Sequence, residues 1–308
     1  MPAARPFPST MHVLERGWLS SNSVVFIDGD EAAVVDTGYY AHAAQTVYLI
    51  DRVRGDRALT RIINTHLHSD HAGGNAQLRE IHAATVAIPS GQAAAVLHWD
   101  TDALTYAPTG QFCPRFNYDL LLDAGDSIRL GGLDWEVLAA PGHDPHMVML
   151  INDDEGLLIS ADALWEDGFG AIFPEIEGES GFAEQRAALQ LIERRRPRVA
   201  IPGHGPPFGG INAALDRAYA RLEALTASPE RNARHVLKVL TKFWLMQVRE
   251  TSRQAAHAHF DSARYFHVIH RRYFADQAFA TMIDRTLQEL AAAGAVQIES
   301  ERVRDVDR

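Results

Sequence analysis

The sequence predicts an α/β protein in which two sets of strands alternate with helices and a helical segment follows. Short apolar runs are joined by Gly- and Asp-containing turns, and His and Asp residues repeatedly fall where a predicted strand ends. Strand signals vanish after residue 210. Because the 308-residue chain exceeds the usual single-domain size, we expect a body over residues 1–210 and an extension over residues 211–308.

The first set of predicted strands begins after Ser23. The sequence VVFIDGDEAAVVDTG places two apolar runs around Asp28-Gly29, which is typical of a β-hairpin. The run LTRIINT predicts a further strand that leads into a histidine cluster. The stretch after Gly74 predicts a helix, and AATVAIP predicts the next strand.

The second set of predicted strands comes in pairs. DSIRLGGLDWEVLAAPGH predicts two strands around Gly131-Gly132, and HMVMLINDDEGLLISAD predicts two more around residues 153–156. Residues 181–195 predict a helix that Pro197 ends, and RVAIPGHG predicts a last strand.

The segment from Ile211 is rich in Ala, Leu, Arg and Glu at helical spacing. We expect helices over 211–226, 230–250 and 277–293, with further helix between them, and a small hairpin in GAVQIESERVRDV. This pattern is compatible with a winged-helix-like appendage, and equally with a helical cap or a dimerisation segment that would make a homodimer.

Composition narrows the classes of function. The net charge of −11 divides into −14 for residues 1–210 (14 Arg, no Lys, 28 Asp and Glu) and +3 for residues 211–308 (15 Lys and Arg, 12 Asp and Glu). An acidic body disfavours nucleic acid as a partner without excluding it. No stretch approaches the roughly 18 apolar residues of a membrane span, and MPAARPFPST has no apolar run after Arg5, so we expect a cytoplasmic protein. Cys113 is the only cysteine, so any metal must be held by His and carboxylate.

The segment NTHLHSDHAGGN is the strongest candidate metal site. Alternating residues of an extended loop point to the same side, so His66 and His68 can bind one ion together. Asp70 and His71 continue around the turn and suit a second ion. The two glycines that follow let the backbone pack closely where a helix begins.

Three isolated residues add to this cluster, and each lies at the exit of a predicted strand. They are His143 in PGH, Asp162 in SAD and His204 in IPGHG. Taken singly, such a histidine is more often a hydrogen-bonded loop residue. Together with the cluster, the three indicate a composite metal site.

The pattern T-H-x-H-x-D-H over Thr65–His71, followed by Gly142-His143, Asp162 and Gly203-His204-Gly205, resembles the metallo-β-lactamase superfamily in its complete dinuclear form. The resemblance spans roughly residues 10–225 and implies a four-layer αββα sandwich. It implies two divalent metal ions, zinc first, with manganese or iron as alternatives. The implied ligands are His66, His68 and His143 for one ion, and Asp70, His71 and His204 for the other, with Asp162 bridging them and Asp36 supporting the loop.

Two such ions lower the pKa of a shared water and polarise a substrate oxygen. We therefore expect a metal-dependent hydrolase in which a bridging hydroxide attacks and Asp70 is catalytic, orienting the nucleophile and passing a proton to the leaving group. Asp162 disfavours a zinc β-lactamase, because those enzymes generally lack the bridging carboxylate. His68 argues against a flavodiiron protein, and the 41 residues between Asp162 and His204 leave no room for a β-CASP insertion.

A small-molecule thioester or lactone is the preferred substrate. An aromatic-rich insertion, HWDTDALTYAPTGQFCPRFNYD, separates the cluster from the next ligand. We expect an apolar pocket with rings from this insertion and from the segment after Asp162, and one arginine that could hold a substrate carboxylate. The candidate substrate-binding residues are Trp99, Tyr106, Phe112, Arg115 and Trp165.

Two alternatives remain open. A nuclease of the winged-helix-bearing subgroup is suggested by the +3 charge of the extension and by basic residues at helical spacing, although a solvated helix face explains them equally simply. Those residues are Arg231, Arg234, Lys238 and Lys242. A mononuclear iron persulfide dioxygenase would use a subset of the same ligands, and metal content distinguishes it.

Overall fold

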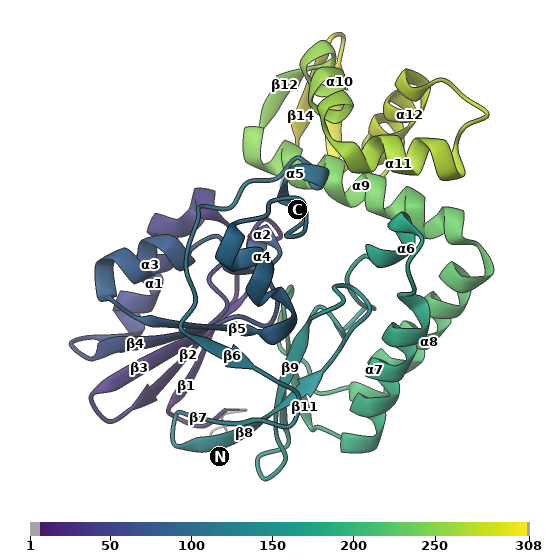
Figure 1. The fold of residues 1–308 in the computed structure, drawn as a ribbon. Helices are drawn as coiled ribbons and strands as arrows, with labels where there is room; N and C mark the ends of the chain where they lie inside the picture. The colour runs from purple at the N-terminus through teal and green to yellow at the C-terminus, as the bar shows by residue number, and fades with distance from the viewer. Residues whose placement is uncertain (1–6, 307–308) are drawn as a thin grey trace.

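The computed structural model describes residues 7–306, and within them two β-sheets stack face to face between layers of helices (Figure 1). The first sheet has the order β1-β2-β3-β4-β5-β6, with strands β1 (Met11–Leu14), β2 (Ser23–Asp28), β3 (Glu31–Val35), β4 (Ala58–Ile63), β5 (Thr85–Pro89) and β6 (Leu120–Leu122). The second has the order β11-β10-β9-β8-β7, with strands β7 (Ser127–Leu130), β8 (Leu133–Ala139), β9 (Val148–Asn152), β10 (Leu157–Ala161) and β11 (Val199–Pro202).

Apolar side chains on both faces of the sheets explain the layering. Phe26 of β2 and Trp135 of β8 meet edge to face between the sheets, with ring centroids 5.4 Å apart. Val25, the neighbour of Phe26, points to the opposite face of its sheet and packs under helices. Because both faces are covered, the strands are near-continuous apolar runs, as expected for buried strands.

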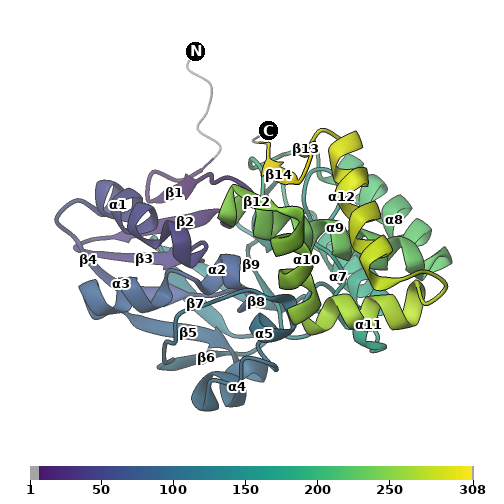
Figure 2. The same ribbon diagram turned by 90° about the horizontal axis from the view of Figure 1, so that it is seen from above.

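The helices form the two outer layers, on opposite sides of the molecule in Figure 2. Ile50 of α1 and Leu78 of α3 pack on the first sheet, whereas Leu189 of α7 and Leu215 of α8 pack on the second. The four-layer αββα fold class is therefore confirmed. The helices and 3₁₀ turns of this part are η1 (Tyr40–His42), α1 (Ala43–Arg54), α2 (Ser69–Ala72), α3 (Asn75–His82), η2 (Ser90–Gln92), α4 (Ala93–His98), α5 (Tyr106–Thr109), α6 (Pro174–Glu177), α7 (Phe182–Arg195) and α8 (Ile211–Ala227).

The predicted strand pairs are confirmed as β2–β3, β7–β8 and β9–β10. The turn of the first pair needs its glycine, because Gly29 has φ +58°. Strands β3 and β4 run parallel, as do β10 and β11, so their carboxyl ends emerge at one edge of the sandwich. The segments that carry the His and Asp candidates leave the sheets there, from the ends of β3, β4, β8, β10 and β11.

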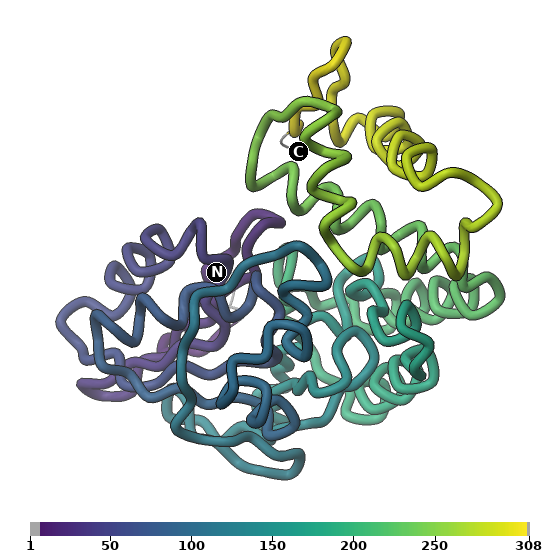
Figure 3. The backbone as a smooth tube through the Cα atoms, turned by 45° about the horizontal axis from the view of Figure 1, so that its top comes forward, coloured from purple at the N-terminus to yellow at the C-terminus, as the bar shows by residue number. Residues whose placement is uncertain are grey.

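The C-terminal segment lies against this edge, as the green and yellow part of the tube in Figure 3 shows. Its elements are α9 (Pro229–Val248), β12 (Glu250–Ser252), α10 (Arg253–Ser262), α11 (Arg264–Tyr273), α12 (Phe279–Ala292), β13 (Val296–Glu299) and β14 (Arg302–Asp305). The predicted helices and the hairpin β13–β14 are confirmed, and β12 adds an unpredicted third strand in the order β12-β14-β13.

The division of the chain at residue 210 stays a prediction. Helix α8 packs into the apolar cluster of the second sheet up to Leu225, whereas most buried apolar residues from Ala233 onward form a separate cluster that also takes in Ala171 and Ile176. None of the helices within residues 7–306 has both the length and the apolar character needed to cross a membrane.

Candidate metal centre

The histidine cluster follows β4 and spans an extended loop and the first turn of a helix. His66 and His68 lie on the extended part, and α2 begins directly after His68 and carries Asp70 and His71. His66 and His71 have no exposed surface, whereas His68 is 9% exposed. All four side chains thus lie in one short segment at the end of β4, two on the loop and two on the helix.

The seven candidate ligands converge. Each of three groups offers ligand atoms that all lie within 4.8 Å of one another. The groups are His66, His68 and His143; His66, His71 and Asp162; and Asp70, His71 and His204. The structure thus brings together every metal-ligand candidate that the sequence suggested.

Asp162 has the central position among them. Its Oδ2 atom lies 3.3 Å from His143 Nε2 and 3.5 Å from His71 Nε2. The same oxygen lies 4.0 Å from His204 Nε2. One carboxylate oxygen therefore faces histidines of both implied ion positions, and the indole of Trp165 holds the other oxygen through a 3.1 Å hydrogen bond.

Hydrogen bonds from outside the cluster orient its side chains. Asp36 accepts bonds from the Thr65 backbone N–H (2.9 Å) and hydroxyl (2.8 Å), and its Oδ2 lies 2.8 Å from His71 Nδ1. His143 Nδ1 lies 2.6 Å from the Ala171 carbonyl oxygen. A histidine that donates from Nδ1 leaves Nε2 free for a metal. These contacts therefore orient His71 and His143 for metal binding through Nε2.

Unpartnered nitrogen atoms support metal binding. His66 Nε2 and His71 Nε2 are buried without a hydrogen-bond partner. A buried polar atom without a partner costs free energy, which a coordinated ion would offset. Imidazole nitrogen with carboxylate oxygen is a donor set that suits zinc, so the residues fit the two implied ions.

The charges within the cluster also favour a cation. Burial, reinforced by neighbouring histidines, holds the pKa of His66 well below 6.5 and lowers that of His68 to about 4. Burial opposes ionisation of Asp162, yet His71 and His204 hold its pKa well below the usual range. For His71 burial is outweighed by the charges of Asp36 and Asp162, which raise its pKa. Ionised carboxylates therefore remain in the site at neutral pH.

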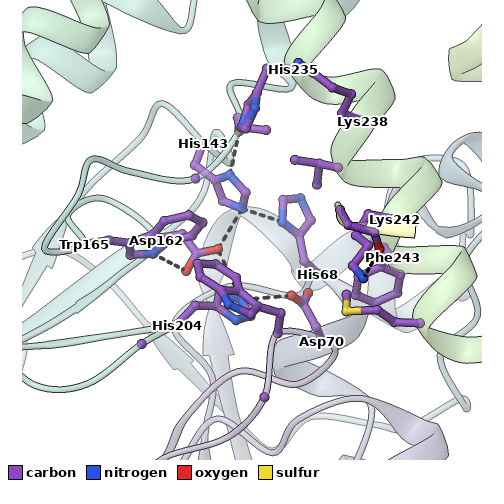
Figure 4. A pocket seen from close by; sticks show the side chains of 18 of the residues that line it. His68, Asp70, His143, Asp162, Trp165, His204, His235, Lys238, Lys242 and Phe243 are labelled. Carbon is purple, nitrogen blue, oxygen red and sulfur yellow. Dashed lines mark hydrogen bonds and ion pairs between the residues drawn. The ribbon is translucent and has the colours of Figure 1, made fainter. Parts of the chain in front are cut away.

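The centre opens into a cavity of about 730 Å³. His68, Asp70, His143, Asp162 and His204 line one side. Residues of α8 and α9 line another, and Figure 4 shows the labelled side chains of α9 facing the cluster across the cavity. Those residues include Arg221, His235, Lys238, Lys242 and Phe243.

Of the five candidate substrate-binding residues, only Trp165 lines this cavity. The expectation is not met for the other four. Tyr106 is buried and donates to the Leu67 carbonyl oxygen at 2.7 Å, and Trp99 packs against it on the outer side of the first sheet. Phe112 is 55% exposed and contacts Tyr40, and Arg115 is exposed. The rings of Trp99, Tyr106 and Phe116 belong to an apolar cluster on the first sheet, and the insertion lines the cavity with Thr105, Thr109 and Gln111 instead.

Trp18 is a cavity residue that the sequence did not reveal. Its ring stacks on His204 with 5.3 Å between centroids and 6° between planes, and it meets Trp165 edge to face. A single tryptophan between the first two strands carries no local signal. The basic spacing along α9 was visible, but it suggested a nucleic-acid surface, whereas Lys238 and Lys242 line the cavity.

His235 makes the stability of the fold dependent on pH. Its Nε2 lies 2.8 Å from Arg221 Nη2, and burial, followed by the charges of Arg221 and Lys238, lowers its pKa to about 3. In the unfolded chain His235 becomes protonated as the pH falls through about 6.5, whereas in the folded chain it stays neutral down to about pH 3. The free energy of unfolding should therefore fall below pH 6.5, by about 1.4 kcal/mol per pH unit for this group.

His235→Gln keeps a hydrogen-bond acceptor and should remove this part of the pH dependence. Urea unfolding between about pH 5 and pH 7.5 measures the difference in slope from the unsubstituted protein. The exposed His98 provides the control substitution, His98→Gln. Parallel pH profiles for the unsubstituted protein and His235→Gln would contradict the assignment.

The sandwich and the cluster at its edge together define an αββα protein with a candidate dinuclear metal centre. Residues 16–204 match the family model of the Metallo-beta-lactamase superfamily. Since the match covers more than half of the chain, the protein belongs to this superfamily.

Curated relatives in the superfamily include thioester hydrolases. A hydroxyacylglutathione hydrolase of Nitrobacter winogradskyi is 35% identical over 115 residues, which is 37% of this chain and 38% of the relative. The match thus spans well under half of that relative's length. The acyl-coenzyme A thioesterase MBLAC2 of Bos taurus is 28% identical over 220 residues, covering 64% of this chain and 78% of the relative.

Solved structures show the same fold. A metallo-beta-lactamase family protein from Thermus thermophilus aligns with a TM-score of 0.57 at 19% identity, covering 96% of this chain and 99% of the other. The BLEG-1 B3 metallo-beta-lactamase aligns with a TM-score of 0.55 at 23% identity, covering 67% of this chain and 96% of the other. The first alignment includes the C-terminal segment.

Proposed function

We propose that this protein is a hydrolase that binds two divalent metal ions, zinc first and manganese or iron as alternatives, and cleaves a small thioester, with a lactone as the second choice. The observation that carries the proposal is the convergence of seven His and Asp side chains at the wall of a large cavity. The thioester hydrolases among the relatives support the same class of substrate.

In the proposed site, His66, His68 and His143 would hold one ion and Asp70, His71 and His204 the other, with Asp162 as a ligand shared between them. The bound ions would supply a water of lowered pKa and polarise the substrate carbonyl. Asp70 lines the cavity, and its Oδ2 lies 3.1 Å from His204 Nε2. Although burial opposes it, hydrogen bonding to His204 keeps the pKa of Asp70 below its ordinary value, so this carboxylate can accept a proton from the attacking water and deliver it to the leaving group.

The remainder of the cavity suits an apolar acyl group. Trp18 and Trp165 lie beside His204, and Phe173 lies 5.2 Å from the His68 ring, measured between ring centroids. From α9, Phe243 and Met246 add further apolar surface. These apolar side chains beside the reacting centre would exclude water and orient an apolar substrate.

The nuclease alternative gains no support from the basic residues that suggested it. Lys242 is paired with the buried Asp305, and Lys238 and Arg234 both contact Glu289. The persulfide dioxygenase alternative is tested by metal content below. A cytoplasmic location and a homodimer through the C-terminal helices stay predictions.

Metal analysis and chelation test the proposal. Protein purified without a polyhistidine tag should contain about two zinc or manganese ions per chain by ICP-MS. EDTA should abolish hydrolysis of a thioester and lactone panel, and zinc or manganese should restore it, because the nucleophile depends on the ions. One iron per chain, with oxygen consumed on a persulfide and no hydrolysis, would establish the dioxygenase instead.

A further inference from the structure

Arg221 is a fixed cation in the wall of the cavity, on helix α8. Its guanidinium carbon lies 5.0 Å from the centroid of the Phe169 ring, and its Nη2 donates to His235 Nε2 at 2.8 Å. Arg221 also packs over Gly168, where an added Cβ atom would lie 3.1 Å from Arg221 Cδ and Nη1. These contacts hold the side chain in one orientation.

The charge of Arg221 is not balanced by a neighbouring carboxylate. Among residues 7–306, none of the Asp and Glu side chains lies within ion-pair distance of its guanidinium. Its hydrogen-bond partner His235 is neutral at physiological pH, because burial and then the charge of Arg221 lower the pKa of this histidine to about 3. A half-buried guanidinium without a carboxylate is costly, and a bound anion would compensate it.

Lys238 adds a second positive charge to the cavity wall that holds Arg221. Lys238 lines the same cavity, and its Nζ lies 3.6 Å from Glu289 Oε2. That carboxylate is shared, because Arg234 lies 2.9 Å and Arg285 3.2 Å from Oε1 of Glu289. Glu289 is therefore shared among three cations and only partly balances Lys238, whose charge acts with that of Arg221 on His235.

We propose that Arg221 and Lys238 form a subsite for an anionic group of the substrate, a phosphate or a carboxylate. The proposal rests on the proposed function, because it names the class of thioester: one whose thiol or acyl part carries a negative charge. The carbonyl would lie at the metal centre while the anionic group binds the guanidinium, whose planar donors match either oxyanion. Arg221 acts here on binding and specificity, away from the bond that breaks.

Three thioesters with the same acyl group test the subsite. The thiol part is coenzyme A, which carries phosphates; glutathione, which carries carboxylates; or N-acetylcysteamine, which is neutral. Arg221→Gln should lower kcat/KM about tenfold or more for at least one anionic substrate, mainly through KM, and leave the neutral one unchanged. A loss confined to coenzyme A identifies phosphate, and a loss confined to glutathione identifies carboxylate. An equal loss for all three thioesters, or none, overturns the subsite.

Matched variants separate local from general effects. Arg194→Gln removes the same charge from an exposed position on α7 outside the cavity lining and should behave like the unsubstituted protein. Arg221→Lys keeps the charge and should recover part of the binding.

A binding measurement tests the anion subsite independently of hydrolysis. If none of the thioesters is hydrolysed, the thioester assignment of the proposed function fails, and calorimetry with pyrophosphate and succinate on the full-length, zinc-loaded protein decides the subsite. Binding of either anion that weakens about tenfold in Arg221→Gln but not in Arg194→Gln supports it. Equal binding by the three proteins, or none by any, overturns it.

Discussion

Asp162→Ala should lose metal binding and hydrolysis together. The carboxylate is 3% exposed and lies within 4.0 Å of nitrogen atoms of three candidate ligands, so its negative charge lies between the two implied ion positions. Loss of residues that merely support a metal ligand costs about 10- to 100-fold in affinity or activity, and loss of the bridging group should exceed that range. Metal content by ICP-MS and thioester hydrolysis provide the two measurements.

Asp167→Ala is the matched control for this substitution. Asp167 lines the same cavity, but its side chain is 87% exposed and pairs with Arg217 at 3.1 Å. Its removal should leave metal content and activity near those of the unsubstituted protein, because exposed ion pairs contribute little. An Asp162→Ala protein that retains both ions and full activity would refute the proposed centre.

Asp36→Asn should weaken both the fold and the metal centre. The carboxylate accepts hydrogen bonds from the backbone and hydroxyl of Thr65 and contacts His71 Nδ1, and it is 3% exposed. An amide retains only one oxygen acceptor and turns a donor towards groups that also donate. We expect a loss of about 2–3 kcal/mol in unfolding free energy and about 10- to 100-fold in zinc affinity.

Zinc competition with a chromophoric chelator and urea unfolding measure the two effects. Asp51→Asn supplies the control, since Asp51 on α1 is partly exposed and lies 2.6 Å from Arg54 Nε and 3.4 Å from His82 Nε2, outside the metal centre. It should cost less than about 1 kcal/mol and leave zinc affinity unchanged. If Asp36→Asn lowers stability but binds zinc as tightly as the unsubstituted protein, Asp36 supports only the fold.

The strands and the convergence of the candidate metal ligands were predictable because their signals are local. The apolar runs around Gly29 and around residues 131–132 carry the strand period and its turn within about 15 residues. His66, His68, Asp70 and His71 lie within six residues of one another, so their spacing alone indicates ion binding. Predicting that His143, Asp162 and His204 join this cluster required one further inference, namely that the ends of their strands meet at one edge of the sandwich.

The substrate side of the site was less predictable, because aromatic side chains pack equally well in a core or a pocket. Tyr106 and Trp99 are residue types that often line a cavity, yet both rings pack in the apolar cluster on the first sheet. Trp18, in contrast, is isolated in the sequence, and the fold stacks its ring on His204 in the cavity. Nothing in the neighbouring sequence distinguishes the two outcomes.

The sequence by itself determined the α/β class, the strand pairs and the candidate metal ligands, because periodicity, turn residues and ligand type are properties of short segments. Only the tertiary structure decided what faces those ligands. Helix α9 begins only at Pro229, far beyond Asp162 in the sequence, yet its Lys238 and Phe243 complete the cavity, and α8 brings Arg221 to the same space. Such placement depends on how apolar clusters pack between distant helices, which no local pattern encodes.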